Sequence, residues 1–209
     1  VQKMKDGVDG WGNTNWYDKV YGTGTRTHHN ISATGGSDRV RFFASIGYLN
    51  EDGNIDNYGY NRLNLRSNID AKLTKSLTFT LGVSGRIEKR DSPRYSANPD
   101  DWHNVPQQVI RALPYVPDTY EYEGKTYNVS TPTASSPVAP LASINESGYS
   151  KSNYSYIQSN FSLKYDAPWL KGLSFKFQGA YDLTYNFSKI LSNPYEVMIM
   201  NCLLYTSPS

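Results

Sequence analysis

Apolar and polar side chains alternate almost without interruption between Leu63 and Leu73. The odd-numbered positions are apolar except Ser67, and the even-numbered positions are polar or charged. Successive side chains of an extended chain point to opposite faces, so this stretch predicts a strand with one apolar and one polar face. Residues 77–88 repeat the pattern after a connection of residues 74–76. The two stretches therefore predict a tight hairpin of two-faced strands.

Other stretches alternate in the same way with less regularity, and together they predict six antiparallel strands. The predicted strands cover residues 25–34, 39–49, 63–73, 77–88, 153–165 and 173–187. Strands of soluble proteins are usually about 5–6 residues long. A strand of about 11 residues is ~36 Å long and, tilted by about 45°, crosses ~25 Å, the height of the lipid-facing band of an outer-membrane barrel. The pattern favours an all-β antiparallel meander, a partial segment of a large transmembrane β-barrel, over a large soluble β-sheet.

The connections between the predicted strands alternate between short and long. The short ones are residues 35–38, 74–76 and 166–172, and the long ones are residues 50–58 and 89–152. All short turns then lie at one end of the sheet and all long loops at the other. Outer-membrane barrels show this arrangement, with short periplasmic turns and long extracellular loops.

Residues 89–152 form one long loop, which is expected to be extracellular and either functional or disordered. Its many prolines argue against any strand in its middle. One short helix is predicted over residues 105–113, because Pro106 suits a first helical turn and Pro114 ends the helix.

Aromatic side chains of this loop are weak candidates for substrate binding, because their rings could stack on sugars or on peptide side chains. These candidates are Trp102, Tyr115, Tyr120, Tyr122 and Tyr127. The alternative is that the same rings pack the loop against its neighbours.

Composition argues against several other functions. Lys and Arg number 21 against 19 Asp and Glu, and the net charge of +2 gives no electrostatic reason to expect a nucleic-acid partner. The single cysteine excludes an internal disulfide and a cysteine-based zinc site. His28 and His29 would point to opposite faces of a strand, so they do not predict a shared metal. We therefore predict no catalytic residues, no metal, no cofactor and no enzymatic activity.

The expected organisation has three parts. Residues 1–24 lead into the barrel as an extracellular segment, and residues 25–187 form the partial barrel, including the long loop. The alternation fades after Phe187, so residues 188–209 are expected to be an irregular tail. Residues 200–209 are expected to be non-native junction sequence.

Several motifs resemble SusC/RagA-type TonB-dependent outer-membrane transporters. They are NTNWYD at residues 13–18, GTG at 22–24, HNISATGG at 29–36, RFFASIGYL at 41–49, EDG at 51–53 and RLNLRSNID at 62–70. The resemblance is close from about residue 13 to 90 and looser from 154 to 185. The order and spacing of these motifs, rather than any one of them, carry the resemblance.

The resemblance implies part of a plugged barrel of about 22 strands in the outer membrane of a Gram-negative, Bacteroidota-like cell. Such transporters import glycans or peptides with energy from TonB, which engages an N-terminal part missing from this sequence. They work with a SusD-like surface lipoprotein. The apolar face would meet outer-membrane lipid, and the polar face would line the lumen through Asn64, Arg66, Asn68, Asp70 and Arg86. The alternative function is a secreted, soluble carbohydrate-binding β-sandwich module.

Overall fold

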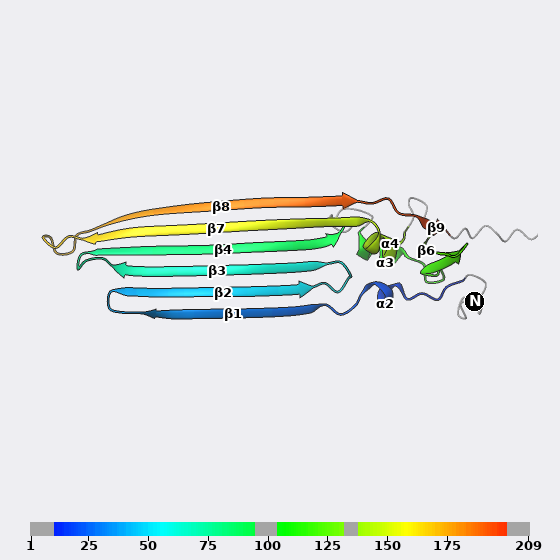
Figure 1. The fold of residues 1–209 in the computed structure, drawn as a ribbon, viewed down its shortest axis with the longest axis horizontal. Coiled ribbons are helices and arrows are strands. Elements are labelled where there is room, and N and C mark those ends of the chain that lie inside the picture. Colours follow the sequence, from blue (N-terminus) through cyan, green and yellow to red (C-terminus); the bar gives the residue numbers. More distant parts are fainter. Residues whose placement is uncertain (1–10, 95–103, 132–137, 200–209) are drawn as a thin grey trace, which may run out of the picture.

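The computed structural model describes residues 11–94, 104–131 and 138–199, and a long antiparallel sheet dominates it (Figure 1). In the described part of the chain this sheet has six strands, in the order β1-β2-β3-β4-β7-β8. The strands are β1 (Thr25–Gly36), β2 (Val40–Asp52), β3 (Gly59–Lys72), β4 (Leu77–Pro93), β7 (Gly148–Asp166) and β8 (Ser174–Ser192). Each strand pairs with the next one along the sheet, which confirms the predicted all-β meander.

The register keeps the apolar side chains of all strands on one face. Ile46 lies opposite Leu65, Leu65 opposite Gly85, and Gly85 opposite Ile157. Directly opposed residues of an antiparallel pair point to the same side of the sheet. The alternation in each strand therefore adds up to a continuous apolar face and a continuous polar face.

The apolar face carries a band of exposed hydrophobic side chains, which we call the apolar band. Every second residue of each strand belongs to it. These are the even-numbered residues of 40–48 in β2 and, in the other strands, the odd-numbered residues of 31–35 in β1, 63–71 in β3, 77–87 in β4, 157–165 in β7 and 175–187 in β8. Phe177 and Tyr181 are each 65% exposed. From Phe175 to Tyr185 the strand rises ~33 Å, which a tilt of about 40° reduces to ~25 Å. A band of this height matches the lipid-facing belt of a membrane barrel.

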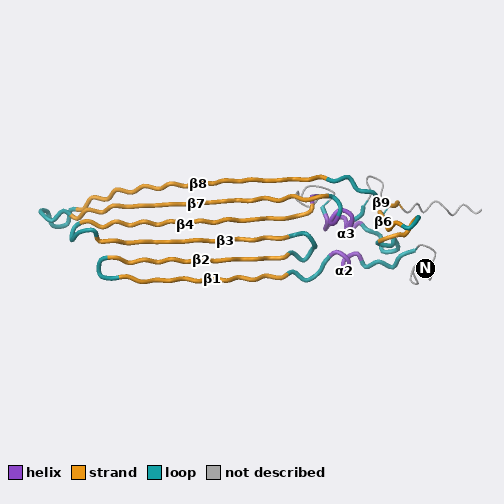
Figure 2. Tube along the Cα trace, in the orientation of Figure 1, coloured by secondary structure: helices purple, strands orange, loops and turns teal. Residues whose placement is uncertain are grey.

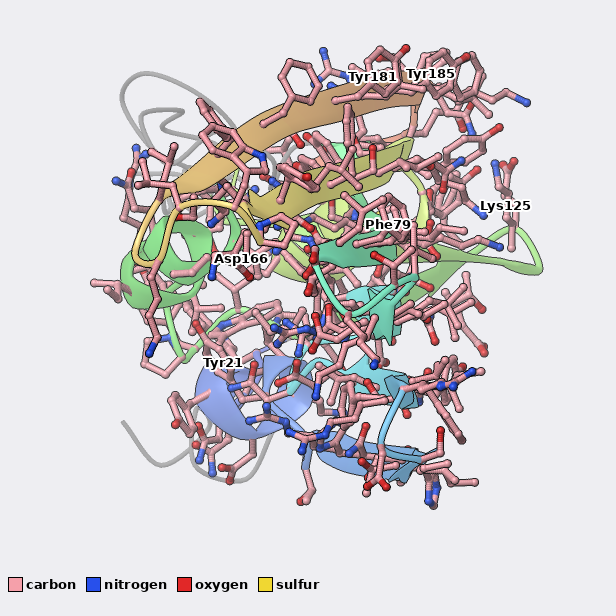
Figure 3. All side chains as sticks on the ribbon, turned by 90° about the vertical axis from the view of Figure 1, so that its left-hand side faces the viewer. Tyr21, Phe79, Lys125, Asp166, Tyr181 and Tyr185 are labelled. Carbon is pink, nitrogen blue, oxygen red and sulfur yellow. The ribbon has the colours of Figure 1, made fainter. Side chains whose placement is uncertain are left out.

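Aromatic rings mark both borders of the apolar band. Tyr165 and Phe175 lie near the short turns, with the 70% exposed Trp169 in the turn between β7 and β8. Tyr48 and Tyr185 lie at the opposite border. Figure 3 looks along the strands from the turn end and shows Tyr181 and Tyr185 together at the β8 edge. Aromatic girdles of this kind flank the apolar belt of outer-membrane barrels.

Most strands continue further toward the loop end than the alternation predicts. β4 ends at Pro93 and β7 begins at Gly148, so the long loop covers residues 94–147 rather than 89–152. β8 likewise ends at Ser192, five residues past Phe187, where the prediction placed the start of an irregular tail. Beyond the apolar band the alternation is lost: in β4 and β7 most residues on both faces are polar, and in β8 the apolar residues Ile190 and Leu191 are adjacent and point to opposite faces. Hydrophobic periodicity therefore carries no signal there although backbone pairing continues.

The connections lie at the predicted ends of the sheet, although only residues 94–147 form a long loop: the loop of residues 53–58 is one residue shorter than the turn of residues 167–173. The turns of residues 37–39, 73–76 and 167–173 lie at one end of the sheet, and the loops of residues 53–58 and 94–147 lie at the other (Figure 1). Figure 2 shows the helices confined to that loop end. Among the described residues, no helix is long and apolar enough to cross a membrane.

The long loop, the segment before β1 and the segment after β8 fold together into a structure that we call the loop cap. Its described elements are α2 (Trp16–Val20), α3 (Val105–Arg111), α4 (Pro140–Asn145), β5 (Thr119–Tyr122), β6 (Lys125–Ser130) and β9 (Val197–Ile199). The short helix predicted from Pro106 is confirmed as α3, whose first turn is capped by the Asn104 side chain. The expectation of no strand in the loop is wrong: β5 and β6 form a hairpin where Glu123 and Gly124 adopt the positive φ angles of a tight turn.

Two small hydrophobic clusters and a few polar contacts hold the loop cap together. Val20, Ile55, Val105 and Ile144 are buried in one cluster, which joins three separate segments of the chain. Trp16 is buried in the other, and its indole Nε1 donates a hydrogen bond to the Leu113 carbonyl at 3.0 Å. The segment before β1 is therefore fixed to the long loop.

An ion pair also joins α2 to the long loop. Lys19 Nζ lies 2.6 Å from Asp118 Oδ2. Burial alone would raise the pKa of the Asp118 carboxyl, but the hydrogen bond and charge of Lys19, together with backbone amides, outweigh burial and lower it.

Candidate functional site

Three charged side chains follow one another on the polar face of β4. Arg86, Glu88 and Arg90 are spaced two residues apart, so they project from the same face of the strand. Arg86 Nε lies 3.0 Å from Glu88 Oε1, and Arg90 lies 3.1 Å from Glu88 Oε2. The Glu88 residue is only 4% exposed, and a buried carboxylate is tolerated when it is paired in this way.

Neighbouring strands place tyrosine rings against the two arginines. The Arg86 guanidinium lies 4.3 Å from the Tyr156 ring centroid. The Arg90 guanidinium lies 5.2 Å from the ring of Tyr154 and 5.7 Å from that of Tyr60. These are cation–π distances, and the rings hold the guanidinium groups in defined positions. The site therefore depends on the pairing of β3, β4 and β7.

A third arginine completes the group, which we call the arginine–tyrosine cluster. Arg62 of β3 lies opposite Glu88 in the register. Its Nε is buried and, within the described residues, has no hydrogen-bond partner. Two guanidinium groups thus pair with one carboxylate, and a third arginine lies at the opposite register position, so this cluster has more positive than negative side chains.

A hollow of about 540 Å³ lies beside the arginine–tyrosine cluster at the loop end of the sheet. Arg90 and Tyr60 line it together with Glu51, Ser150 and Ser152. Arginine forks, hydroxyl groups and an aromatic ring are groups that bind carboxylates, amides and sugars. The hollow can therefore hold a polar ligand. Asp52 and Asp91 line it as well as Glu51, so three carboxylates face one guanidinium and an anionic group is not favoured over a neutral one.

The five residues expected to line a lumen share one face with the arginine–tyrosine cluster. Asn64 lies opposite Arg86, and Arg66, Asn68 and Asp70 follow at alternate positions of β3. Arg66 and Asn68 line a second polar hollow of about 500 Å³, which also includes Asp182 of β8. These expected residues therefore lie along one polar surface, below the cluster.

The loop aromatics do not gather into one site. Tyr115 packs against Trp11 with ring centroids 5.7 Å apart, as the packing alternative expects. Tyr120 lies opposite Tyr127 in the hairpin of β5 and β6, and Tyr122 is exposed nearby. Trp102 lies outside the described residues.

The members of the arginine–tyrosine cluster other than Arg86 were not predicted as site residues. Their signal was present in the alternate charges at residues 86, 88 and 90 and the alternate tyrosines at 154 and 156. These residues come together only because β4 pairs with β7 across the long loop, and hydrophobic periodicity does not predict which strands pair. No group of three or more His, Cys, Asp or Glu residues suited to a metal is found in the described ranges.

Sequence comparison relates the chain to transport receptors. It is 33% identical over 84 residues to TonB-dependent receptor P3 of Formosa agariphila, a match that covers 40% of this chain and 8% of the relative. It is 30% identical over 74 residues to TonB-dependent receptor P39 of the same organism, which covers 35% of this chain and 7% of the relative. No protein-family model matches the chain.

Structure comparison extends the likeness to nearly the whole chain. The closed-closed state of the RagAB peptide importer matches with a TM-score of 0.66 and 21% identity, over 93% of this chain and 22% of the importer chain. The open-open state matches with a TM-score of 0.66 and 20% identity, over 95% of this chain and 23% of that one.

The fold is thus a segment of a large antiparallel β-barrel, with its short turns and long loops at opposite ends. Within this class, the chain is similar in sequence to TonB-dependent receptors and in fold to the RagAB importer, which confirms the resemblance to SusC/RagA-type transporters. It spans less than a quarter of the length of the proteins it matches.

Proposed function

We propose that this chain is part of the barrel wall of an outer-membrane importer that takes up peptides or glycans. The apolar band carries this proposal, because exposed hydrophobic side chains cover ~25 Å of six paired strands within the described residues. A soluble carbohydrate-binding β-sandwich would cover such a face with a second sheet. In the described part of the chain, the other sheet, β5-β6-β9, belongs to the loop cap instead.

The polar face is then the lumen wall, and the loops are extracellular. The arginine–tyrosine cluster and its hollow lie near the loop end, where a ligand from outside would first meet the wall. Import would use energy from TonB, as the similarity to TonB-dependent receptors supports. A SusD-like lipoprotein would be the surface partner, which agrees with the likeness to the two-component RagAB peptide importer. The chain contributes binding and passage rather than bond-making.

Charge placed on either face of β4 of the full-length parent protein tests this proposal. Leu81 belongs to the apolar band and Thr80 to the polar face of the same strand. Leu81→Arg should destabilise the inserted barrel by about 2–4 kcal/mol, because arginine near the middle of a bilayer loses its hydration. Thr80→Arg is the matched control and should insert normally. Equal insertion of both variants in outer-membrane fractions would overturn the assignment of the faces.

A second experiment addresses the substrate. Cells that lack the parent gene should lose uptake of labelled oligopeptides or oligosaccharides, and the wild-type gene should restore it. Arg90→Met should weaken uptake of both kinds of substrate, because it removes the guanidinium donor that lines the hollow. Unchanged uptake in cells without the gene would reject the importer function.

A further inference from the structure

Three lysines lie on the apolar side of the sheet, directly beyond the loop-end border of the apolar band. Lys89 follows Ile87 of β4 by two residues, and Lys189 follows Phe187 of β8 by two residues. Lys151 of β7 is the register partner of Lys189. All three are exposed, and we call them the lysine patch.

The height of the lysine patch corresponds to the headgroup layer of a bilayer. Two residues of a tilted strand rise ~5 Å, whereas the headgroup layer is ~5–8 Å thick on each side of the hydrocarbon core. Lysine side chains also reach along the surface to place their ammonium groups at that level. Lys89 and Lys189 therefore lie where lipid phosphates would be.

One tyrosine holds two of the lysines together. Lys151 Nζ lies 5.1 Å and Lys189 Nζ 5.7 Å from the ring centroid of Tyr149. The negative face of a ring attracts both ammonium groups and offsets their mutual repulsion. Two positive charges are thus kept close together with no anion between them in the described structure.

Acidic neighbours reduce the positive charge only in part. Asp91 lies opposite Lys151 in the register, and Asp52 and Asp56 line a hollow with Lys151 farther toward the loops. Within the described residues, the ion pairs found involve other lysines and not Lys89, Lys151 or Lys189. The lysine patch therefore remains open to an external anion.

We propose that the lysine patch binds the phosphorylated headgroup of a lipid in the leaflet that surrounds the loop end of the barrel. The proposal rests on the membrane position inferred above, and it adds a lipid site on the outer wall. Continuity with the apolar band explains why the ligand is a lipid: the acyl chains would lie on the band while the phosphates meet the ammonium groups.

The test uses the full-length parent protein in phosphatidylcholine nanodiscs that contain bisphosphorylated or dephosphorylated lipid A. Native mass spectrometry counts the lipid A retained by each protein. The wild type should retain the bisphosphorylated form preferentially. The double variant Lys151→Glu/Lys189→Glu should retain at least about fivefold less, since each surface lysine contributes about that factor. Lys151→Gln/Lys189→Gln should give a smaller loss in the same direction.

Lys164 and Lys176 provide the matched control, because they are register partners on the same two strands but lie on the polar face. Lys164→Glu/Lys176→Glu should retain lipid A like the wild type. Equal retention by the Lys151/Lys189 variant, equal loss in the control, or displacement of lipid A by inorganic phosphate alone would overturn the proposal.

Membrane insertion is measured on every variant to separate this proposal from the proposed function. A wild-type protein that does not insert would reject the barrel assignment itself. Normal insertion together with equal lipid A retention by the wild type and the lysine variants would reject only the proposed lipid site.

Discussion

The Arg86 guanidinium and the Glu88 carboxylate meet at 3.0 Å on the polar face of β4, and the two residues differ sharply in exposure. The Glu88 side chain is 5% exposed and that of Arg86 is 44% exposed. The carboxylate of Glu88 is thus covered, whereas the guanidinium of Arg86 remains exposed on the polar face of the sheet. Its role is to position the arginines, which remain available to a ligand.

Replacing Glu88 should therefore lower the stability of the sheet. Glu88→Gln removes the charge that pairs with Arg86 and Arg90, and we expect a loss of about 1–3 kcal/mol in the free energy of unfolding. Urea unfolding of the full-length protein in vesicles measures it. Glu121→Gln, in the exposed β5–β6 hairpin, is the control and should have no effect. Identical midpoints for both variants would contradict the structural role of Glu88.

Gly179 of β8 leaves room for an aromatic ring on the apolar face. A Cβ atom at residue 179 would lie 2.6 Å from the ring of Phe161 on β7. Gly179→Ala should destabilise the β7–β8 pair by about 1–3 kcal/mol, because the ring must leave its position. Phe161→Leu should recover part of this loss in a double-mutant cycle. Strict additivity of the two changes in free energy would show that the Phe161 ring and residue 179 do not interact.

The contact between Lys19 and Asp118 should make the loop cap sensitive to acid. The pKa of Asp118 is below its ordinary value of 3.8, so the ion pair is intact above that pH and is lost as the pH falls through the lowered pKa. The pair is partly exposed, so the effect should be about 0.5–1 kcal/mol. The protection of the residue 16–20 amides against hydrogen exchange, relative to the intrinsic exchange rate at each pH, should fall below about pH 4 in the wild type. Asp118→Asn should exchange faster at neutral pH and lose this acid step.

Trp16 should protect the long loop from proteases. Trp16→Phe removes the hydrogen bond to the Leu113 carbonyl and leaves that partly buried acceptor without its donor, at a cost of about 1 kcal/mol. Limited proteolysis of intact cells should then cut within residues 104–131 more rapidly. Trp169→Phe, in an exposed turn at the opposite end of the sheet, is the matched control. Unchanged cleavage in Trp16→Phe would mean that the tryptophan does not hold the loop.

The sheet could be predicted from the sequence wherever its two faces differ in polarity. Leu63 to Leu73 shows this most clearly, because apolar and polar side chains occupy successive positions on opposite faces of the strand. Near Lys89 and Lys151 both faces are polar and the contrast disappears. The prediction therefore ended β4 five residues too early and began β7 five residues too late. Hydrophobic periodicity therefore locates the apolar band rather than the full strands.

The loop cap and the arginine–tyrosine cluster were harder to predict for a different reason. Tyr156 contacts Arg86 across more than 60 intervening residues, and Thr14 donates a hydrogen bond to the Val116 carbonyl across a separation of 102 residues. Local propensity indicated the α3 helix through Pro106, because its cause lies within one turn. Contacts between distant segments depend on the register of the whole sheet.

The pairing of β4 with β7 also has a consequence for how the wall is assembled. Every other neighbouring pair in this sheet is joined by a connection of three to seven residues, whereas residues 94–147 separate β4 from β7. Closing a long connection costs more chain entropy than closing a tight hairpin, and it slows the formation of the contact. We expect β1–β4 and β7–β8 to form first as two independent blocks. Their joining, which also creates the arginine–tyrosine cluster, would then be the slow step of folding.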